Sequence, residues 1–210
     1  RAFLQAAFPA AMTSWQPPML AQRFTELPAS TLTLPFARPE YDGVSAATPL
    51  AQMKFEQAAT PAGDLLLGMT AGSTGETGAL LILLGGAWLV ARNMMNWRIP
   101  AAIFATVAGL AALLGWIAPG QYPGPLFMLL SGGLMLGAVF MATDMVASPI
   151  TARGVVLYGV LIGTLVVVIR LWGGMPEGVM YAILIANAVS PHIDRLVQPR
   201  AFGTTGRGVR

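Results

Sequence analysis

The sequence predicts an all-α, polytopic membrane protein with about five transmembrane helices, broken or re-entrant elements between them, and one long extramembrane loop. Hydrophobic residues make up 55% of the 210 residues and charged residues only 10%, whereas soluble domains average about 25% charged residues. Apolar runs close to spanning length recur along the chain, separated by short connectors rich in glycine and proline. Because the chain begins with Arg1 and shows no signal peptide, we expect it to be the C-terminal part of a longer protein and the C-terminal half of an inverted-repeat fold.

The composition excludes several kinds of site. The sequence has no cysteine and one histidine, which excludes disulfides, thiolate nucleophiles, cysteine-bound iron–sulfur clusters and the usual histidine-based zinc and haem sites. Redox chemistry would therefore require a bound organic cofactor. The net charge of +3 includes four arginines in residues 195–210, and this distribution indicates membrane topology rather than nucleic-acid binding.

The chain begins with two segments outside the predicted helix bundle. Residues 1–20 are expected to hold the end of a preceding membrane helix and its exit through the interface, where two prolines follow Trp15. An unstructured terminus explains these residues equally well. Residues 21–62 hold seven charged residues and five prolines, and we expect them to form a long extramembrane connector with little helix.

The connector contains a short motif, Asp42-x-x-Ser45-Ala46-Ala47-Thr48. Its small residues allow a tight turn and the close approach of a bulky group. Thr48 ends the motif with a hydroxyl that can be esterified, and Pro49 biases it toward extended backbone. Taken without its surroundings, the stretch is an ordinary turn.

Residues 63–192 are expected to form the transmembrane helix bundle, which begins with a discontinuous element. An apolar piece, residues 63–70, is too short to span a bilayer, and a glycine-rich break leads from it into the apolar run Ala79–Ala91. Breaks of this kind often form binding sites in transporters. Glu76 lies in the break, either as a functional carboxylate at the membrane edge or as a charge that complements the helix dipole.

Three spans and a short last helix follow. The spans are predicted at Ile99–Ala118, Pro125–Ala142 and Val155–Leu171, and the short helix at Val179–Val189. The small residues of the second span permit close helix packing: Ser131, Gly132, Gly133 and Gly137. Methionines are expected to pack rather than to act as ligands, at positions 128, 135 and 141.

Charged residues lie at the ends of these spans. Arg170 ends one span, and its side chain is expected to extend to the membrane interface. Glu177, in a second glycine-rich break, is either a functional carboxylate or a helix N-terminal charge. Asp144 and Arg153 share a connector, where an exposed ion pair would contribute little.

The arginines predict which side of the membrane each connector faces. One set of connectors and the C-terminal tail hold seven arginines, whereas the short loops of the other side hold only Arg170. The first set is expected to be cytoplasmic, which places the long connector 21–62 and Thr48 on the opposite face, periplasmic or external. Residues 193–210 form a cytoplasmic basic tail. His192 and Asp194 precede it in what is expected to be an interface turn, not a metal site.

Four pieces of the sequence resemble the D subunit of Rnf-type electron transport complexes and the B subunit of the sodium-translocating NADH:quinone reductase. The pieces are residues 42–48, 72–77, 142–144 and 173–178 with the run to Asp194, and the resemblance extends from about residue 9 to residue 203. The flavinylation motif of this family reads Asp-x-x-(Ser/Thr)-Gly-Ala-Thr. Ala46 replaces the usual glycine, and Met145 stands where proline is common.

The resemblance implies a membrane subunit of an ion-translocating redox complex. Such complexes pass electrons between NADH and ferredoxin or quinone and couple the transfer to Na⁺ or H⁺ movement. FMN is implied as a phosphoester on Thr48, attached by a flavin transferase, and Asp42 and Ser45 are expected to support the attachment or its recognition. Riboflavin between the helices is a further implication. The other subunits are the implied partners, because this subunit alone has no catalytic residues for a complete reaction.

Two other functions fit the same residues. A secondary solute transporter would use the two broken elements around Glu76 and Glu177 as its central site. A structural membrane anchor would need only the apolar bundle. Neither would carry flavin, so covalently bound flavin distinguishes the redox subunit from both.

Overall fold

The computed structural model describes residues 48–57, 60–68, 70, 72 and 77–198. The chain divides into two compact units, Arg1–Thr48 and Pro49–Arg210, and of the first unit only Thr48 is described. The predictions for Asp42, Ser45, Glu76 and residues 1–20 lie outside the described residues, as does the tail beyond residue 198.

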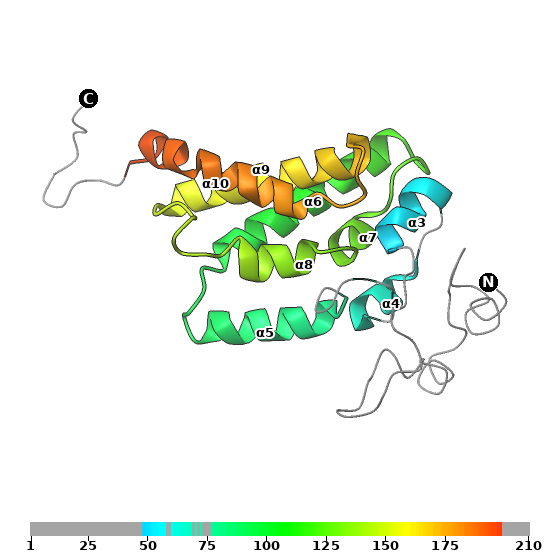
Figure 1. The fold of residues 1–210 in the computed structure, drawn as a ribbon, viewed down its shortest axis with the longest axis horizontal. Coiled ribbons are helices and arrows are strands. Elements are labelled where there is room, and N and C mark those ends of the chain that lie inside the picture. Colours follow the sequence, from blue (N-terminus) through cyan, green and yellow to red (C-terminus); the bar gives the residue numbers. More distant parts are fainter. Residues whose placement is uncertain (1–47, 58–59, 69, 71, 73–76, 199–210) are drawn as a thin grey trace, which may run out of the picture. The chain divides into compact units, whose positions relative to one another are not determined.

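The described part of the second unit is helical and contains no strand (Figure 1). Two of its helices, α6 and α9, are long and apolar enough to cross a membrane, and α5 is apolar but shorter. These two helices confirm the predicted positions of two spans, while the larger number of spans stays a prediction. In chain order the elements are α3 (Pro49–Glu56), α4 (Ala62–Leu67), α5 (Ala79–Ala91), α6 (Arg98–Ile117), α7 (Pro125–Leu130), α8 (Leu134–Leu136), the π-helix η1 (Gly137–Met141), α9 (Ala152–Trp172) and α10 (Val179–Leu196).

Helices α6 and α9 form the central pair of the bundle. Their backbones approach closely because α9 presents glycine where they cross: a Cβ at Gly159 would lie 2.6 Å from Ala102 Cβ, and one at Gly163 would lie 2.8 Å from Thr106 Cβ. Glycines four residues apart form one smooth face, which allows the van der Waals packing that holds helices together in lipid. On the other side of α9, the Tyr158 hydroxyl donates to the Asn187 side-chain oxygen and so ties α9 to α10.

The outer faces of the helices are apolar as well. Only 28% of the most apolar 18-residue stretch of α6 is buried within the bundle. Large side chains such as Trp116 and Leu81 point outward, with exposed fractions of 82% and 73%. Exposing so much apolar surface to water is unfavourable in free energy, whereas the hydrocarbon core of a bilayer accommodates it. The apolar faces therefore support a membrane location.

The predicted continuous span Pro125–Ala142 is wrong, because the segment breaks after its first few residues. Helix α7 ends at Leu130, Ser131 is extended, and Gly132 adopts the left-handed backbone at φ +65°. The chain resumes helix at α8 and then widens into η1, where the Ala142 amide donates to the Gly137 carbonyl at 2.7 Å. Glycine permits the left-handed conformation without steric cost, and π-helical turns of this kind are frequent at functional sites.

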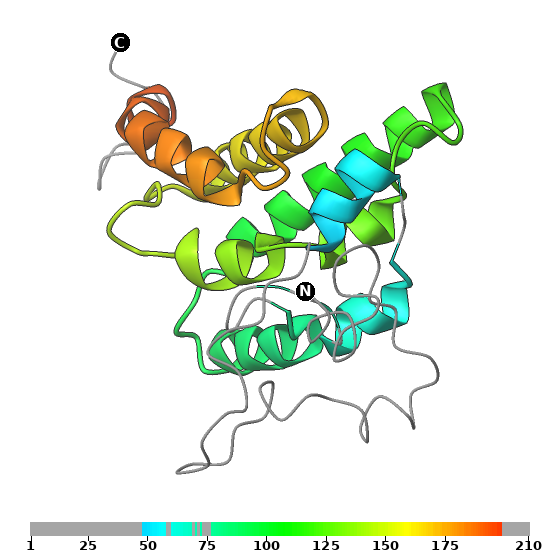
Figure 2. The same ribbon diagram turned by 45° about the vertical axis from the view of Figure 1, so that its right-hand side comes forward.

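Helices also form where a connector was predicted. Helix α3 lies in the segment expected to have little helix, and its Leu50 is buried in a cluster with Leu65 of α4 and Phe127 of α7. The predicted short piece before Ala79 is confirmed as α4, which ends at the left-handed Gly68. Figure 2 shows α5 on the opposite side of the α8–η1 segment from α10, and this segment contacts both helices.

Helix α10 is longer than predicted. It continues through Pro191 to Leu196, so His192 and Asp194 lie within a helix and not in the expected interface turn. Pro191 lies inside this helix, although proline lacks an amide hydrogen and usually interrupts a helix. Asp194 accepts a hydrogen bond from the Ile150 amide at 3.1 Å, which fixes the end of α10 against the connector before α9.

Candidate functional site

A buried arginine stands at the C-terminal end of α9, beside the break between α7 and α8. Arg170 is only 4% exposed. Its guanidinium donates to two main-chain carbonyls at the end of α7, Met128 at 2.6 Å and Ser131 at 2.9 Å. These carbonyls have no helical partner because the helix stops there. Arg170 therefore caps α7 from the neighbouring helix, and the prediction that it extends to the interface is wrong.

Glu177 completes the arrangement from the connector between α9 and α10. Its Oε1 lies 3.2 Å from Arg170 Nη2 in an ion pair. The Gly133 amide, at the start of α8, donates to Oε2 at 3.1 Å, and the Gly178 amide donates to Oε1 at 3.2 Å. The carboxylate thus neutralises the guanidinium and also binds free amides at the beginnings of two helices, where negative charge is favoured. This geometry agrees with the interpretation of Glu177 as a helix N-terminal charge, and a functional role for the carboxylate stays a prediction.

Lys54 of α3 binds the same connector from outside. Its Nζ donates to three main-chain carbonyls, those of Arg170 at 3.1 Å, Gly173 at 2.5 Å and Met175 at 3.0 Å. The ammonium group therefore satisfies the end of α9 as a C-terminal cap. Through Lys54 and the buried Leu50, α3 is fixed to the bundle at two points.

Ser131 lies in the middle of this cluster and is fully buried. Within the described part of the chain its hydroxyl has no hydrogen-bond partner, although its carbonyl accepts from Arg170. The adjacent Gly132 lies so close to Glu177 that a Cβ there would overlap Oε2 and also Leu50 Cδ1. The break is therefore filled by the carboxylate, and we call Lys54, Ser131, Arg170 and Glu177 the break cluster.

The side chains of the break cluster hold helix ends in position. Two cations and one carboxylate give it a formal charge of +1, and the Glu177 side chain is 35% exposed and so reachable from outside the bundle. Among the described residues no group of three or more His, Cys, Asp or Glu side chains could hold a metal ion. The cluster holds a broken helix, two helix starts and α3 in one arrangement.

Sequence reasoning found only part of the break cluster. Glu177 was singled out, whereas Lys54 was noted only as a connector charge and Ser131 only as a small packing residue. One available signal was an arginine inside an apolar run, seven residues before a glutamate. The predicted pair of Asp144 and Arg153 does not form among the described residues, where Asp144 accepts from the Val146 amide.

Thr48, the residue expected to carry FMN, is the one member of the predicted flavin site that lies among the described residues. It is partly exposed, lies outside any helix and directly precedes Pro49, the first residue of α3. Helix α3 has no acidic residue in its first turn as the structure describes it. The negative charge of a phosphoester is favoured beside a helix start. The residues present therefore fit a phosphate-linked cofactor.

Comparisons with known proteins agree on one family. Residues 1–203 match the model of the NQR2, RnfD, RnfE family. The chain is 43% identical to the D subunit of the ion-translocating oxidoreductase complex of Stutzerimonas stutzeri, over 99% of this chain and 62% of that protein. It is 39% identical to the D subunit of the proton-translocating ferredoxin:NAD(+) oxidoreductase complex of Clostridium ljungdahlii, over 97% of this chain and 59% of that protein.

The name of a third relative specifies Na⁺ instead of protons as the translocated ion. The D subunit of the Na(+)-translocating ferredoxin:NAD(+) oxidoreductase complex of Acetobacterium woodii is 38% identical, over 98% of this chain and 57% of that protein. The chain thus spans about three-fifths of the length of these relatives, between 57% and 62%.

Proposed function

The chain belongs to the NQR2, RnfD, RnfE family, and from this membership we propose that it is part of a membrane subunit of an ion-translocating oxidoreductase complex. In this proposal the subunit carries FMN covalently on Thr48 and passes electrons between NADH- and ferredoxin-linked partner subunits. The transfer is coupled to transport of Na⁺ or H⁺. The names of the relatives support the redox and ion-translocation parts of this proposal, since they describe ion-translocating oxidoreductase complexes.

The observation that carries the proposal is the position of Thr48. Thr48 ends the sequence Asp42–Thr48, is partly exposed as a residue and stands immediately before α3. A phosphoester on Thr48 Oγ1 would tether FMN while its ring system stays free to exchange electrons, which is the chemistry that flavin supplies. Asp42 and Ser45 are proposed to support recognition by a flavin transferase.

The break cluster has a supporting part in this proposal. Helix α3 continues from Thr48, and Lys54 binds carbonyls at the end of α9. A fixed α3 would restrict the volume that a tethered group can explore, and a smaller volume raises its effective concentration beside an electron partner. We propose that α3 and Lys54 set the position from which the tether extends.

The orientation in the membrane is proposed from the arginines. Connectors that hold Arg92, Arg98 and Arg153 are placed in the cytoplasm, and Thr48 is placed on the periplasmic side of a bacterial inner membrane. A reporter fused after residue 48 should therefore be active as a periplasmic enzyme and inactive as a cytoplasmic one. The opposite result would reverse the orientation.

The first testable prediction concerns covalent flavin. Thr48→Ala should abolish the flavin fluorescence of the denatured protein on a gel, and mass spectrometry should find unmodified peptide. Thr60→Ala is a matched control, because Thr60 also precedes a proline and a short helix, α4. It should retain full fluorescence when both proteins are expressed with the transferase.

Other outcomes would change the assignment. Fluorescence that survives Thr48→Ala would place the attachment on another residue. A wild-type protein without flavin, in cells that load other flavoproteins of this type, would contradict the redox function. The broken helices and Glu177 would then favour a solute transporter, and the bundle alone would favour an anchor.

A further inference from the structure

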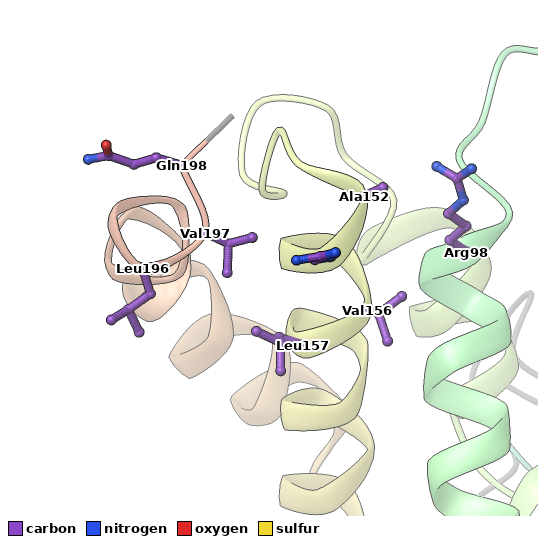
Figure 3. A pocket seen from close by; sticks show the side chains of 8 residues that line it. Arg98, Ala152, Val156, Leu157, Leu196, Val197 and Gln198 are labelled. Carbon is purple, nitrogen blue, oxygen red and sulfur yellow. The ribbon is translucent and has the colours of Figure 1, made fainter. Parts of the chain in front are cut away.

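The end of the bundle opposite the break cluster carries an open groove of about 670 Å³. Three helices form it: α6 with Arg98, α9 with Arg153, Val156 and Leu157, and α10 with Leu196 and the two residues after it. Figure 3 shows these side chains coming from the same end of the three helices. None of the eight residues that line the groove is acidic.

The two arginines place uncompensated positive charge in the groove. Both are exposed, and across the described residues neither guanidinium has an ion-pair partner. Each lies in the first turn of its helix, where the helix dipole is also positive and no acidic residue occurs in that turn as described. Asp194 and Asp144 do not line the groove and accept hydrogen bonds elsewhere, Asp194 from the Ile150 amide and Asp144 from the Val146 amide.

The groove is apolar beyond the arginines. Val156 and Leu157 are 43% and 50% exposed, and Val160, one turn further along α9, is 40% exposed. This surface leads from the guanidinium groups toward the centre of the apolar helix. An inorganic anion would use only the arginines, whereas an amphiphile with an anionic head and a hydrocarbon chain would cover both parts.

We propose that this groove binds an anionic phospholipid. Its phosphate lies between Arg98 and Arg153, and an acyl chain follows Val156, Leu157 and Val160 along α9. The exposed Trp97 beside Arg98 suits the headgroup level of a membrane, where tryptophan is enriched. Basic pockets between membrane helices are known to favour anionic headgroups. The site is independent of the flavin on Thr48.

The test uses the intact, detergent-purified complex after removal of bound lipid. Native mass spectrometry measures binding of phosphatidylglycerol, of phosphatidylcholine as the comparison with no net charge, because its choline offsets the phosphate, and of glycerol phosphate as the headgroup alone. The wild type should prefer phosphatidylglycerol over both. Arg98→Gln and Arg153→Gln should each weaken that binding about fivefold, and together about 25-fold, at about one decade per 1.4 kcal/mol and about 1 kcal/mol for each arginine.

A second double variant makes the test specific. Arg92→Gln with Arg195→Gln removes the same charge from exposed residues that do not line the groove, and it should leave binding within about twofold of wild type. Equal losses in both double variants would show a general charge effect and overturn the site. Equal binding of the two lipids by the wild type, or glycerol phosphate binding as tightly as the lipid, would overturn it as well.

Discussion

The two ends of α9 hold arginine in opposite settings. At the C-terminal end Arg170 is 4% exposed and binds two carbonyls and a carboxylate. At the N-terminal end Arg153 is exposed, lines a groove together with Arg98 and has no ion-pair partner among the residues described. Arginine therefore stabilises the interior of the bundle at one end of α9 and is exposed on its surface at the other.

The difference shows what a charged group needs inside an apolar bundle. A buried guanidinium is stable only where carbonyls and a counter-charge meet its donors, and a continuous helix would have no carbonyls to spare. The break after α7 supplies them, so the irregular backbone and the buried arginine depend on each other. At the other end the helices begin regularly, and the arginines are left for water or lipid headgroups.

The largest effect should come from removing the buried arginine. Arg170→Met would leave Glu177 and two carbonyls without their partner, at a cost of about 3 kcal/mol in the free energy of unfolding. The lower end of the range for buried pairs applies because Glu177 is 35% exposed and can be hydrated. Thermal unfolding of the purified protein, followed by tryptophan fluorescence, measures the loss.

The exposed arginine at the other end provides the control. Arg153→Met removes the same charge from the same helix and should change the free energy of unfolding by less than about 0.5 kcal/mol. Arg170→Lys should be intermediate, because one ammonium group cannot serve the forked set of acceptors. Similar losses at Arg170 and Arg153 would contradict the contrast between the two ends of α9.

The sequence predicted the regular parts of this fold and missed the broken one. The apolar runs Ile99–Ala118 and Val155–Leu171 were correct because about twenty apolar residues have few other solutions in a membrane. The break at Gly132 was missed because small residues suit both tight packing and irregular backbone. The long-range contact with Glu177 favours the irregular backbone over a continuous packed helix, and this contact cannot be predicted from composition or spacing.

The contact at the break can be tested with a single methyl group. Gly132→Ala would place a Cβ against the Glu177 carboxylate and Leu50, at a residue with φ +65°, and we expect a loss of about 2–3 kcal/mol. Gly120→Ala is the matched control, because Gly120 has a similar φ of +85° but open space around it. It should lose only the backbone contribution of about 1 kcal/mol. Equal losses in thermal unfolding would show that Glu177 does not occupy the break.

The candidate site was harder to predict than the fold. Arg170 was placed at the interface because a long basic side chain near a helix end usually extends outward. The side chain is buried instead because carbonyls at the end of α7 and the Glu177 carboxylate bind both terminal nitrogens of the guanidinium. The role of Lys54 could not be predicted because its partners are main-chain carbonyls more than a hundred residues away. Every residue has such a carbonyl, so no pattern of residue types indicates these partners.

The smallest effect should appear at Lys54, on the surface of the break cluster. Lys54→Met removes the bonds to the carbonyls of Arg170, Gly173 and Met175 but keeps the apolar stem, so α3 should loosen by about 1 kcal/mol while the bundle stays folded. Hydrogen exchange of residues 49–56 should accelerate about fivefold, because 1 kcal/mol of local opening corresponds to that factor. Gln52→Met, on the same helix, should leave the exchange unchanged, and Lys54→Arg should restore part of the protection. If the exchange of α3 were unaltered by Lys54→Met, the buried Leu50 alone would hold the helix, and Lys54 would not belong to the break cluster.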